Sequence, residues 1–133
     1  MLILGMKMLV ISIIVLFICA YNEQDYSGEW VYQTDSSVFS LTLTQVDSVV
    51  TGYHASVMNY GNRIDEGDEE NLTIRGTVQD GQLTVYVKST YDSDKPGIAK
   101  IVFVGKDSIS FKFITPPSGT YWIPDEAVLG RRK

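Results

Sequence analysis

Short segments in which apolar and polar residues alternate are the feature that most restricts the fold of this chain. In residues 38–45, Phe39, Leu41 and Leu43 alternate with serine and threonine, and residues 108–114 repeat the pattern with isoleucine and phenylalanine. A period of two residues is typical of a β-strand with one buried face, and no long segment shows a helical period. Such segments recur about every ten residues, as they do in small all-β domains. The predicted strands are 29–33, 38–45, 49–57, 71–79, 82–89, 97–104, 108–114 and 120–123.

The links between these strands are mostly short, which favours an antiparallel meander. Asp80-Gly81 has the composition of a two-residue hairpin turn, and 47–48 and 106–107 are equally short links. Eight such strands can close into a barrel that leaves no exposed edge. We therefore expect an all-β fold, a single antiparallel eight-stranded meander closing into a small barrel with a packed apolar core. A β-sandwich is the alternative. Residues 125–129 are expected to form one helical turn, and 131–133 a solvated tail.

The chain begins with an apolar tract, Met8–Ile18, between Lys7 and the single cysteine, Cys19. This tract is shorter than the roughly 20 residues of a spanning helix and fits the hydrophobic region of an export signal. Leu16-Phe17-Ile18-Cys19 resembles the lipobox of bacterial lipoproteins, although Ile18 stands where that family usually has a small residue. The resemblance implies that Cys19 becomes the first mature residue and carries diacylglycerol. We expect an exported protein of the cell envelope, anchored to a membrane through Cys19, or alternatively a secreted soluble one.

The chain then divides into three parts: a signal and lipobox at 1–19, a polar tether at 20–27, and one domain at 28–133. A lone cysteine cannot form an intrachain disulfide, so Cys19 belongs to the signal and not to the fold of the domain. The tether can extend to at most about 26 Å. The domain is therefore expected to lie close to the membrane surface.

Two resemblances to known families concern the domain. Gly28-Glu29-Trp30 resembles the Gly-x-Trp opening of calycin barrels, the lipocalins and avidins, which implies that Trp30 closes one end of the barrel. The pocket tryptophans of avidins have no counterpart here, so biotin binding is not expected. The segments Ser56-Val57 and Gly61–Asp65, together with the ending Pro117–Pro124, resemble small exported bacterial lipoproteins of unassigned function. This second resemblance implies a compartment and a fold type, but no activity.

Several classes of function lack their usual sequence features. The chain has 11 basic and 16 acidic residues, a net charge of −5 and no basic stripe, so we expect no nucleic-acid partner. His54 is the only histidine, which is too few for a zinc site, and no Gly-x-Ser-x-Gly elbow accompanies Ser36 or Ser56. We expect neither an enzyme nor a cofactor; a hydrolase ranks last among the functions considered. His54 is expected to face a polar rim or the solvent.

The longest predicted link, 58–70, is the main candidate for binding, because long loops on β scaffolds frequently carry function. Its carboxylates around Gly67 do not match the spacing of an EF-hand, so a solvated acidic turn is expected there. Arg63 offers a guanidinium fork to an anionic partner. The sequence predicts a monomeric, membrane-anchored binding module that recognises a protein or a glycan. A lipocalin-like carrier of a small apolar ligand is the alternative. Candidate binding residues are Tyr60, Asn62, Arg63, Asp65, Trp122 and His54.

Overall fold

A computed structural model describes residues 24–91 and 94–133 of the chain. The predicted signal, Cys19 and the first part of the tether lie outside the described residues. Within the described part no helix has the length and apolar character needed to cross a bilayer. The strands are β1 (Gly28–Gln33), β2 (Val38–Val46), β3 (Val49–Met58), β4 (Arg63–Glu66), β5 (Ile74–Gln79), β6 (Gln82–Val87), β7 (Gly97–Gly105), β8 (Ser108–Thr115) and β9 (Glu126–Arg131).

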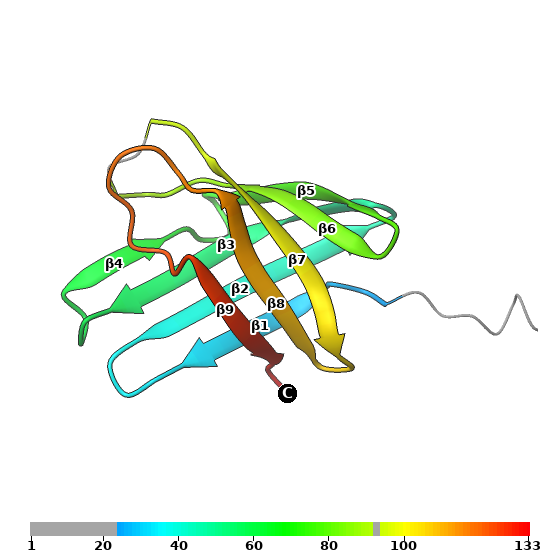
Figure 1. Cartoon of the computed structure of the whole chain (residues 1–133), viewed down its shortest axis with the longest axis horizontal. Helices are drawn as coiled ribbons and strands as arrows, with labels where there is room; N and C mark the ends of the chain where they lie inside the picture. The colour runs from blue at the N-terminus through cyan, green and yellow to red at the C-terminus, as the bar shows by residue number, and fades with distance from the viewer. Residues whose placement is uncertain (1–23, 92–93) are drawn as a thin grey trace, which may run out of the picture.

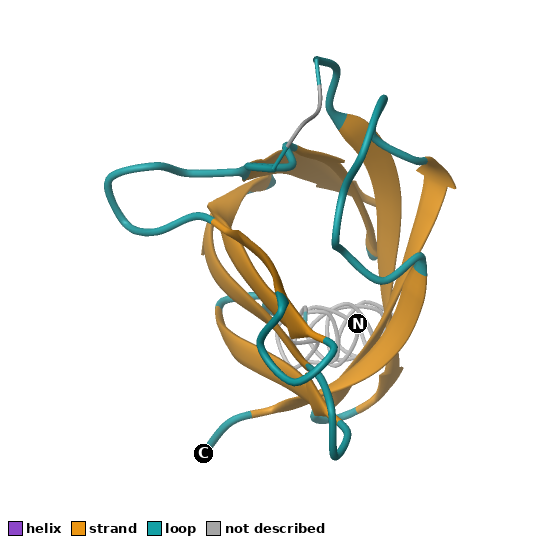
Figure 2. Ribbon diagram, turned by 90° about the vertical axis from the view of Figure 1, so that its left-hand side faces the viewer, coloured by secondary structure: helices purple, strands orange, loops and turns teal. Residues whose placement is uncertain are grey.

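Eight of these strands form a closed antiparallel barrel. Apart from β4, each strand pairs with the next in chain order, and β9 returns to β1 (Figures 1 and 2). The edge of β3 that does not face β2 pairs with two strands: Val49–Gly52 pair with β5, and Ala55–Met58 pair with β4. The predicted eight-stranded meander barrel is confirmed and is consistent with a calycin-like fold. Strand β4 is the addition, and it turns part of the long link 58–70 into a hairpin with β3.

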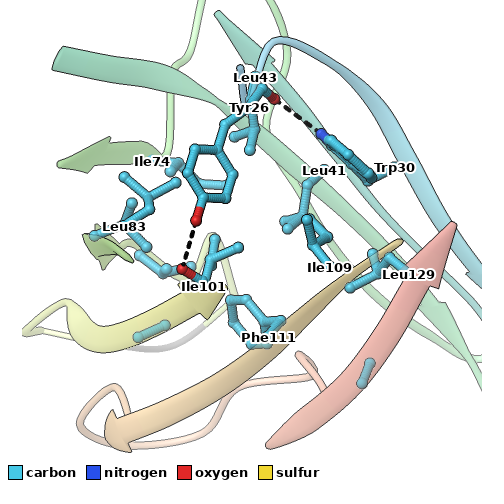
Figure 3. Close-up of a cluster of buried hydrophobic side chains, with 14 of the residues drawn as sticks. Tyr26, Trp30, Leu41, Leu43, Ile74, Leu83, Ile101, Ile109, Phe111 and Leu129 are labelled. Carbon is cyan, nitrogen blue, oxygen red and sulfur yellow. Dashed lines mark hydrogen bonds between the residues drawn. The ribbon is translucent and has the colours of Figure 1, made fainter. Parts of the chain in front are cut away.

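The barrel interior is filled by the inward-facing side chains of all eight strands. Cross-strand register places Trp30 of β1 opposite Leu41 of β2, and Leu41 opposite His54 of β3. Figure 3 shows the apolar cluster around Trp30, Leu41 and Phe111. None of the apolar core residues is more than 9% exposed, and removing such side chains from water is the main favourable term in folding. The packed core expected from the alternating pattern is therefore present.

The C-terminal part of the chain differs from the prediction. The last strand is β9, so both the strand expected at 120–123 and the helical turn expected at 125–129 are wrong. Ala127 and Leu129 are buried while Val128 is exposed, so burial alternates along this segment as it does in a strand. The segment is too short for this alternation to be recognised in the sequence. Arg131 is no part of a solvated tail, because its guanidinium lies 4.1 Å from the centre of the Trp30 ring. Residues 116–125 instead form a loop between β8 and β9.

The two ends of the barrel differ in what they carry. The N-terminal end, as we call it, holds the turns 47–48, 80–81 and 106–107 and receives the chain at Tyr26. There the Tyr26 hydroxyl donates to the carbonyl of Gly81 at 2.7 Å, and the Trp30 indole donates to the Tyr26 carbonyl at 2.9 Å. Trp30 thus lies at this end of the barrel. The opposite end, the hairpin end, carries the β3–β4 turn 59–62, residues 88–91 and the loop 116–125.

Two glycines are required where neighbouring strands approach closely. A Cβ atom at Gly52 would lie 1.9 Å from the carbonyl oxygen of Thr42, and one at Gly76 would lie 1.9 Å from that of Thr84. Both contacts are with backbone, which cannot move aside as a side chain can. At Gly130, by contrast, a Cβ would meet no atom within 4 Å.

We expect Gly52→Ala and Gly76→Ala each to lower the free energy of unfolding by about 1–3 kcal/mol or more, as overpacking does. Gly130→Ala serves as the control and should stay within about 0.5 kcal/mol of the wild type. Urea denaturation followed by tryptophan fluorescence measures all three. Equal effects at Gly52 and Gly130 would contradict the close strand approach.

Candidate functional site

The hairpin end is organised around the carboxylate of Asp65, which is 0% exposed. Its Oδ1 atom accepts hydrogen bonds from His54 Nε2 at 2.9 Å, from the backbone N–H of Thr90 at 2.9 Å and from the Thr90 hydroxyl at 3.1 Å. Its Oδ2 atom accepts from the Ser89 hydroxyl at 2.5 Å and from the backbone N–H of Trp122 at 3.0 Å. One side chain of β4 therefore holds together β3, residues 89–90 and the loop 116–125.

These hydrogen bonds also decide the charge of Asp65. Burial by itself would raise the pKa of this carboxyl, because it disfavours the charged form. Hydrogen bonds from His54, Ser89 and the backbone N–H groups of Thr90 and Trp122 act in the opposite direction and prevail, so the pKa lies well below its usual range. Asp65 is a buried carboxylate that stays ionised and has its oxygen lone pairs occupied.

His54 occupies the barrel interior, so the expectation that it faces a polar rim or the solvent is wrong. It is 0% exposed, and its Nδ1 atom lies 2.7 Å from the hydroxyl oxygen of Thr73. The same hydroxyl oxygen accepts from the His54 backbone N–H at 3.1 Å, which leaves its proton for Nδ1. Of the two tautomers of an imidazole, this network favours the one with the proton on Nε2, which donates it to Asp65. Both ring nitrogens of His54 are thus engaged by protein groups.

Thr73 reaches this position because the chain enters the barrel irregularly before β5. The strand predicted at 71–79 begins only at Ile74, and Thr73 and Ile74 are buried in succession while Leu72 is exposed. The N–H of Thr73 donates to the Gly52 carbonyl at 3.0 Å, which brings its side chain against His54. Strict alternation would have turned Thr73 outward, so the period-two pattern misplaces it.

Trp122 covers the cluster from the loop 116–125. Its carbonyl accepts a hydrogen bond from the Ser56 hydroxyl at 2.6 Å, in addition to the bond that its N–H donates to Asp65. The guanidinium of Arg63 lies 4.4 Å from the centre of the indole ring, and the Tyr91 ring lies 5.3 Å away. Cation–π and aromatic contacts of this kind each contribute about 0.5–1.5 kcal/mol. Trp122 is therefore fixed both through its backbone and through its ring.

The next residue along the chain, Tyr121, belongs to the same loop and is held by Asp125. Its hydroxyl donates to the Asp125 carboxylate at 2.5 Å. Burial, together with this hydrogen bond and the negative charge of Asp125, raises the pKa of Tyr121 to about 12. The loop 116–125 is thus tied down at both of its central aromatic residues.

The backbone at the tip of the β3–β4 hairpin has an unusual conformation. Asn59, Tyr60 and Gly61 have φ angles of 53°, 54° and 88°, all in the left-handed region. Asparagine and glycine adopt this region readily, but a bulky aromatic residue rarely does. The backbone N–H of Tyr60 donates to the Ser36 carbonyl at 2.9 Å, which holds the tip against the β1–β2 connection. The Tyr60 side chain itself is 78% exposed.

The predicted candidates therefore separate into two groups. Tyr60, Asn62 and Arg63 are exposed at the hairpin end, and Trp122 is half-buried beneath Arg63. His54 and Asp65 are buried and position these residues without reaching the surface. Sequence reasoning missed Thr73, Ser89, Thr90 and Tyr91, which lie in two separate segments. No local pattern marks them, because each is defined by a partner more than ten residues away along the chain.

The acidic segment after β4 forms a local turn. The Asp68 carboxylate accepts hydrogen bonds from the backbone N–H groups of Glu70 and Asn71 at 2.9 and 2.8 Å. Among residues 24–91 and 94–133, no group of three His, Cys, Asp or Glu side chains is arranged to hold a metal ion. The geometry agrees with the acidic turn expected there.

Comparison of the chain with protein-family models, with curated proteins and with solved structures found no match. The function must therefore be argued from the geometry of the site itself.

Proposed function

We propose that this protein is a membrane-anchored, non-catalytic binding module whose hairpin end recognises a protein partner. The observation that carries the proposal is the presentation of Tyr60: a large aromatic side chain, 78% exposed, on a backbone conformation that tyrosine seldom adopts. Residues held in sparsely populated conformations cost about 1–3 kcal/mol each and cluster at functional sites. Tyrosine is also among the residues enriched at the energetic centres of protein interfaces.

The surroundings of Tyr60 favour a protein over a glycan at this position. The tip of the hairpin protrudes beyond the barrel wall (Figure 1), so it suits insertion into a concave surface of a partner. Exposed Asn62 and Arg63 stand next to it and supply polar contacts around the aromatic centre. The Asp65 network and the Trp122 contacts fix this end before any partner arrives, which lowers the entropy cost of binding.

The proposed anchor sets the orientation of the module. If Cys19 carries lipid, the chain from Cys19 to Tyr26 can extend to at most about 25 Å before it enters the N-terminal end of the barrel. The hairpin end lies opposite and so faces away from the membrane. Tyr60 would then be the part of the domain most accessible to a partner in the envelope.

Replacing Tyr60 by asparagine should weaken partner binding without lowering the stability of the fold. Asparagine tolerates the left-handed conformation, so Tyr60→Asn should leave the fold as stable as the wild type or up to about 1 kcal/mol more stable. The same change removes the ring and should reduce partner capture at least about tenfold, as loss of an interface centre does. Cross-linked partners recovered from intact cells, with thermal unfolding in parallel, measure both quantities.

The matched control is Val104→Ser, which removes an exposed apolar side chain at the other end of the barrel. It should not change partner capture. Unchanged partner capture by Tyr60→Asn, or an equal loss of capture in both variants, would show that the hairpin end is not the binding surface.

The anchor has an independent measurement. Mass spectrometry of the protein isolated from membranes should show a chain that begins at an acylated Cys19. A lipid-free protein that begins at Tyr21 would refute the anchor while leaving the binding surface untouched. Substituting Cys19 by serine should release the domain from the membrane fraction.

The carrier alternative draws less support from the geometry. The calycin-like barrel suits it, but the inward-facing side chains of Trp30, Leu41, Ile101, Ile109 and Leu129 are 0% exposed. A cavity able to hold a ligand would leave accessible surface on the side chains around it. An apolar fluorescent probe that bound stoichiometrically and was displaced by fatty acids would restore this alternative.

A further inference from the structure

The outer face of β5–β8 carries positive charge in a protein that is acidic as a whole. Every charged residue of these four strands is a cation, namely Arg75 on β5, Lys100 on β7 and Lys112 on β8, and Lys88 directly follows β6. The chain has a net charge of −5. None of these four side chains makes an ion pair with any residue in the described ranges.

The register of the strands brings two of these cations together. Lys100 of β7 pairs directly with Lys112 of β8, and like charges at opposite positions of a sheet destabilise it. Glu126 of β9 pairs with the far side of Lys112, which leaves Lys100 facing Thr84 of β6. Lys100 therefore has no carboxylate at either of its paired positions, so its charge is open to an anion from solution.

Two adjoining hollows lie on the same face, around the cross-strand pair of Arg75 and Tyr86. Their volumes are about 260 and 430 Å³, and both are lined by these two side chains. The Tyr86 ring is 60% exposed between them. Thr51 lines the smaller hollow, and Thr77 and Thr84 line the larger one. An exposed ring, a guanidinium and side-chain hydroxyls therefore converge on one surface.

We propose that this outer face binds an acidic carbohydrate, a chain of sugars that carry carboxylate groups. The Tyr86 ring offers an apolar plane for the C–H face of a sugar, while the planar fork of Arg75 matches a carboxylate with two hydrogen bonds. Lys100 and Lys88 stand on either side to receive the charges of neighbouring sugars. The threonine hydroxyls donate to and accept from sugar hydroxyl groups.

The closed barrel disfavours an acidic peptide at this face. Extended peptides are commonly bound along the free edge of a sheet, through backbone hydrogen bonds. Strands β5–β8 have both edges paired, so they offer side chains only. The face is also separate from the hairpin tip, so this proposal stands or falls independently of the protein partner proposed above.

Isothermal titration of the full-length protein in neutral detergent with oligogalacturonate tests the proposal. We expect binding that weakens as salt rises, and no binding of the neutral malto-oligosaccharide of equal length. Arg75→Gln and Tyr86→Ala should each weaken binding at least about fivefold, since each removes one of the two principal contacts. Lys106→Gln is the matched control, because it removes an equal charge from an exposed turn at the N-terminal end.

All three substitutions are at exposed positions and should leave the unfolding temperature unchanged. Absence of binding to oligogalacturonate, or equal weakening by Lys106→Gln, would overturn the proposal. Equal binding of poly-L-glutamate, or of vesicles containing phosphatidylglycerol, would show a general attraction for anions and would overturn it as well.

Discussion

Replacing Asp65 by alanine is expected to lower the free energy of unfolding by about 3–5 kcal/mol, the cost of breaking a buried charged network from one side. The carboxylate accepts hydrogen bonds from His54, Ser89, Thr90 and Trp122. Without it, these donors are left buried without a partner, and the segments they belong to lose their common attachment. Denaturant unfolding monitored by circular dichroism measures the change.

Glu69→Ala is the matched control, because Glu69 is an exposed carboxylate a few residues further along the same segment. It should stay within about 0.5 kcal/mol of the wild type. A loss at Asp65 no larger than at Glu69 would mean that the hairpin end is held by other contacts.

The same network predicts a direction of pH dependence. The pKa of Asp65 is lower in the folded state than in the unfolded chain, where it is about 3.9. The ionised carboxylate therefore stabilises the fold at every pH above about 4, and this stabilisation is lost progressively as the pH falls further. The difference in unfolding free energy between the wild type and Asp65→Asn should shrink from pH 6 to pH 2. A difference that stayed constant across this range would contradict the assignment of a charged Asp65.

Replacing Trp30 by alanine should have a comparable effect at the other end of the barrel, a loss of about 3–5 kcal/mol, as is typical of large aromatic residues in cores. The ring is 0% exposed, packs against Phe103 with centroids 5.8 Å apart and lies under the Arg131 guanidinium. Its N–H bond to the Tyr26 carbonyl fixes the chain where it enters the barrel. The variant should therefore also expose the segment before β1 to protease.

Limited proteolysis together with thermal unfolding measures both effects of Trp30→Ala. Val104→Ala, at an exposed position of β7, provides the comparison and should change neither. Wild-type stability in Trp30→Ala would show that the N-terminal end does not depend on this residue.

The regular strands could be predicted from the sequence because their signal is local. Strands β2 and β8 alternate inward apolar residues with polar ones over residues 39–44 and 108–113, so pattern alone gives their type and their buried face. Strand β9 has only Ala127 and Leu129 inside, next to an exposed Val128, and the same reasoning mistook it for a helical turn. Strand β4 forms only because the hairpin with β3 extends past the point where β3 leaves β5.

The buried polar cluster around Asp65, by contrast, could not be predicted from local sequence patterns. Asp65 stood out as a charged residue in a long acidic link, which favours an exposed side chain on composition alone. Its burial depends on donors from Ser89, Thr90 and Trp122, up to 57 positions away along the chain. His54 was expected at a polar rim or in the solvent because its neighbours on the same strand face are Gly52 and Ser56. Its partner Thr73 is 19 positions away along the chain. Long-range hydrogen bonds of this kind leave no period in the sequence.

Site-specific photo-cross-linking in living cells tests the central claim most directly. A photoreactive phenylalanine analogue at Tyr60 should give a discrete cross-linked protein, and the same analogue at Val104 should not. Both positions are exposed, so incorporation should leave the barrel folded. A product at Tyr60 alone would place the partner at the hairpin end. No product at Tyr60, or the same product from both positions, would contradict the account.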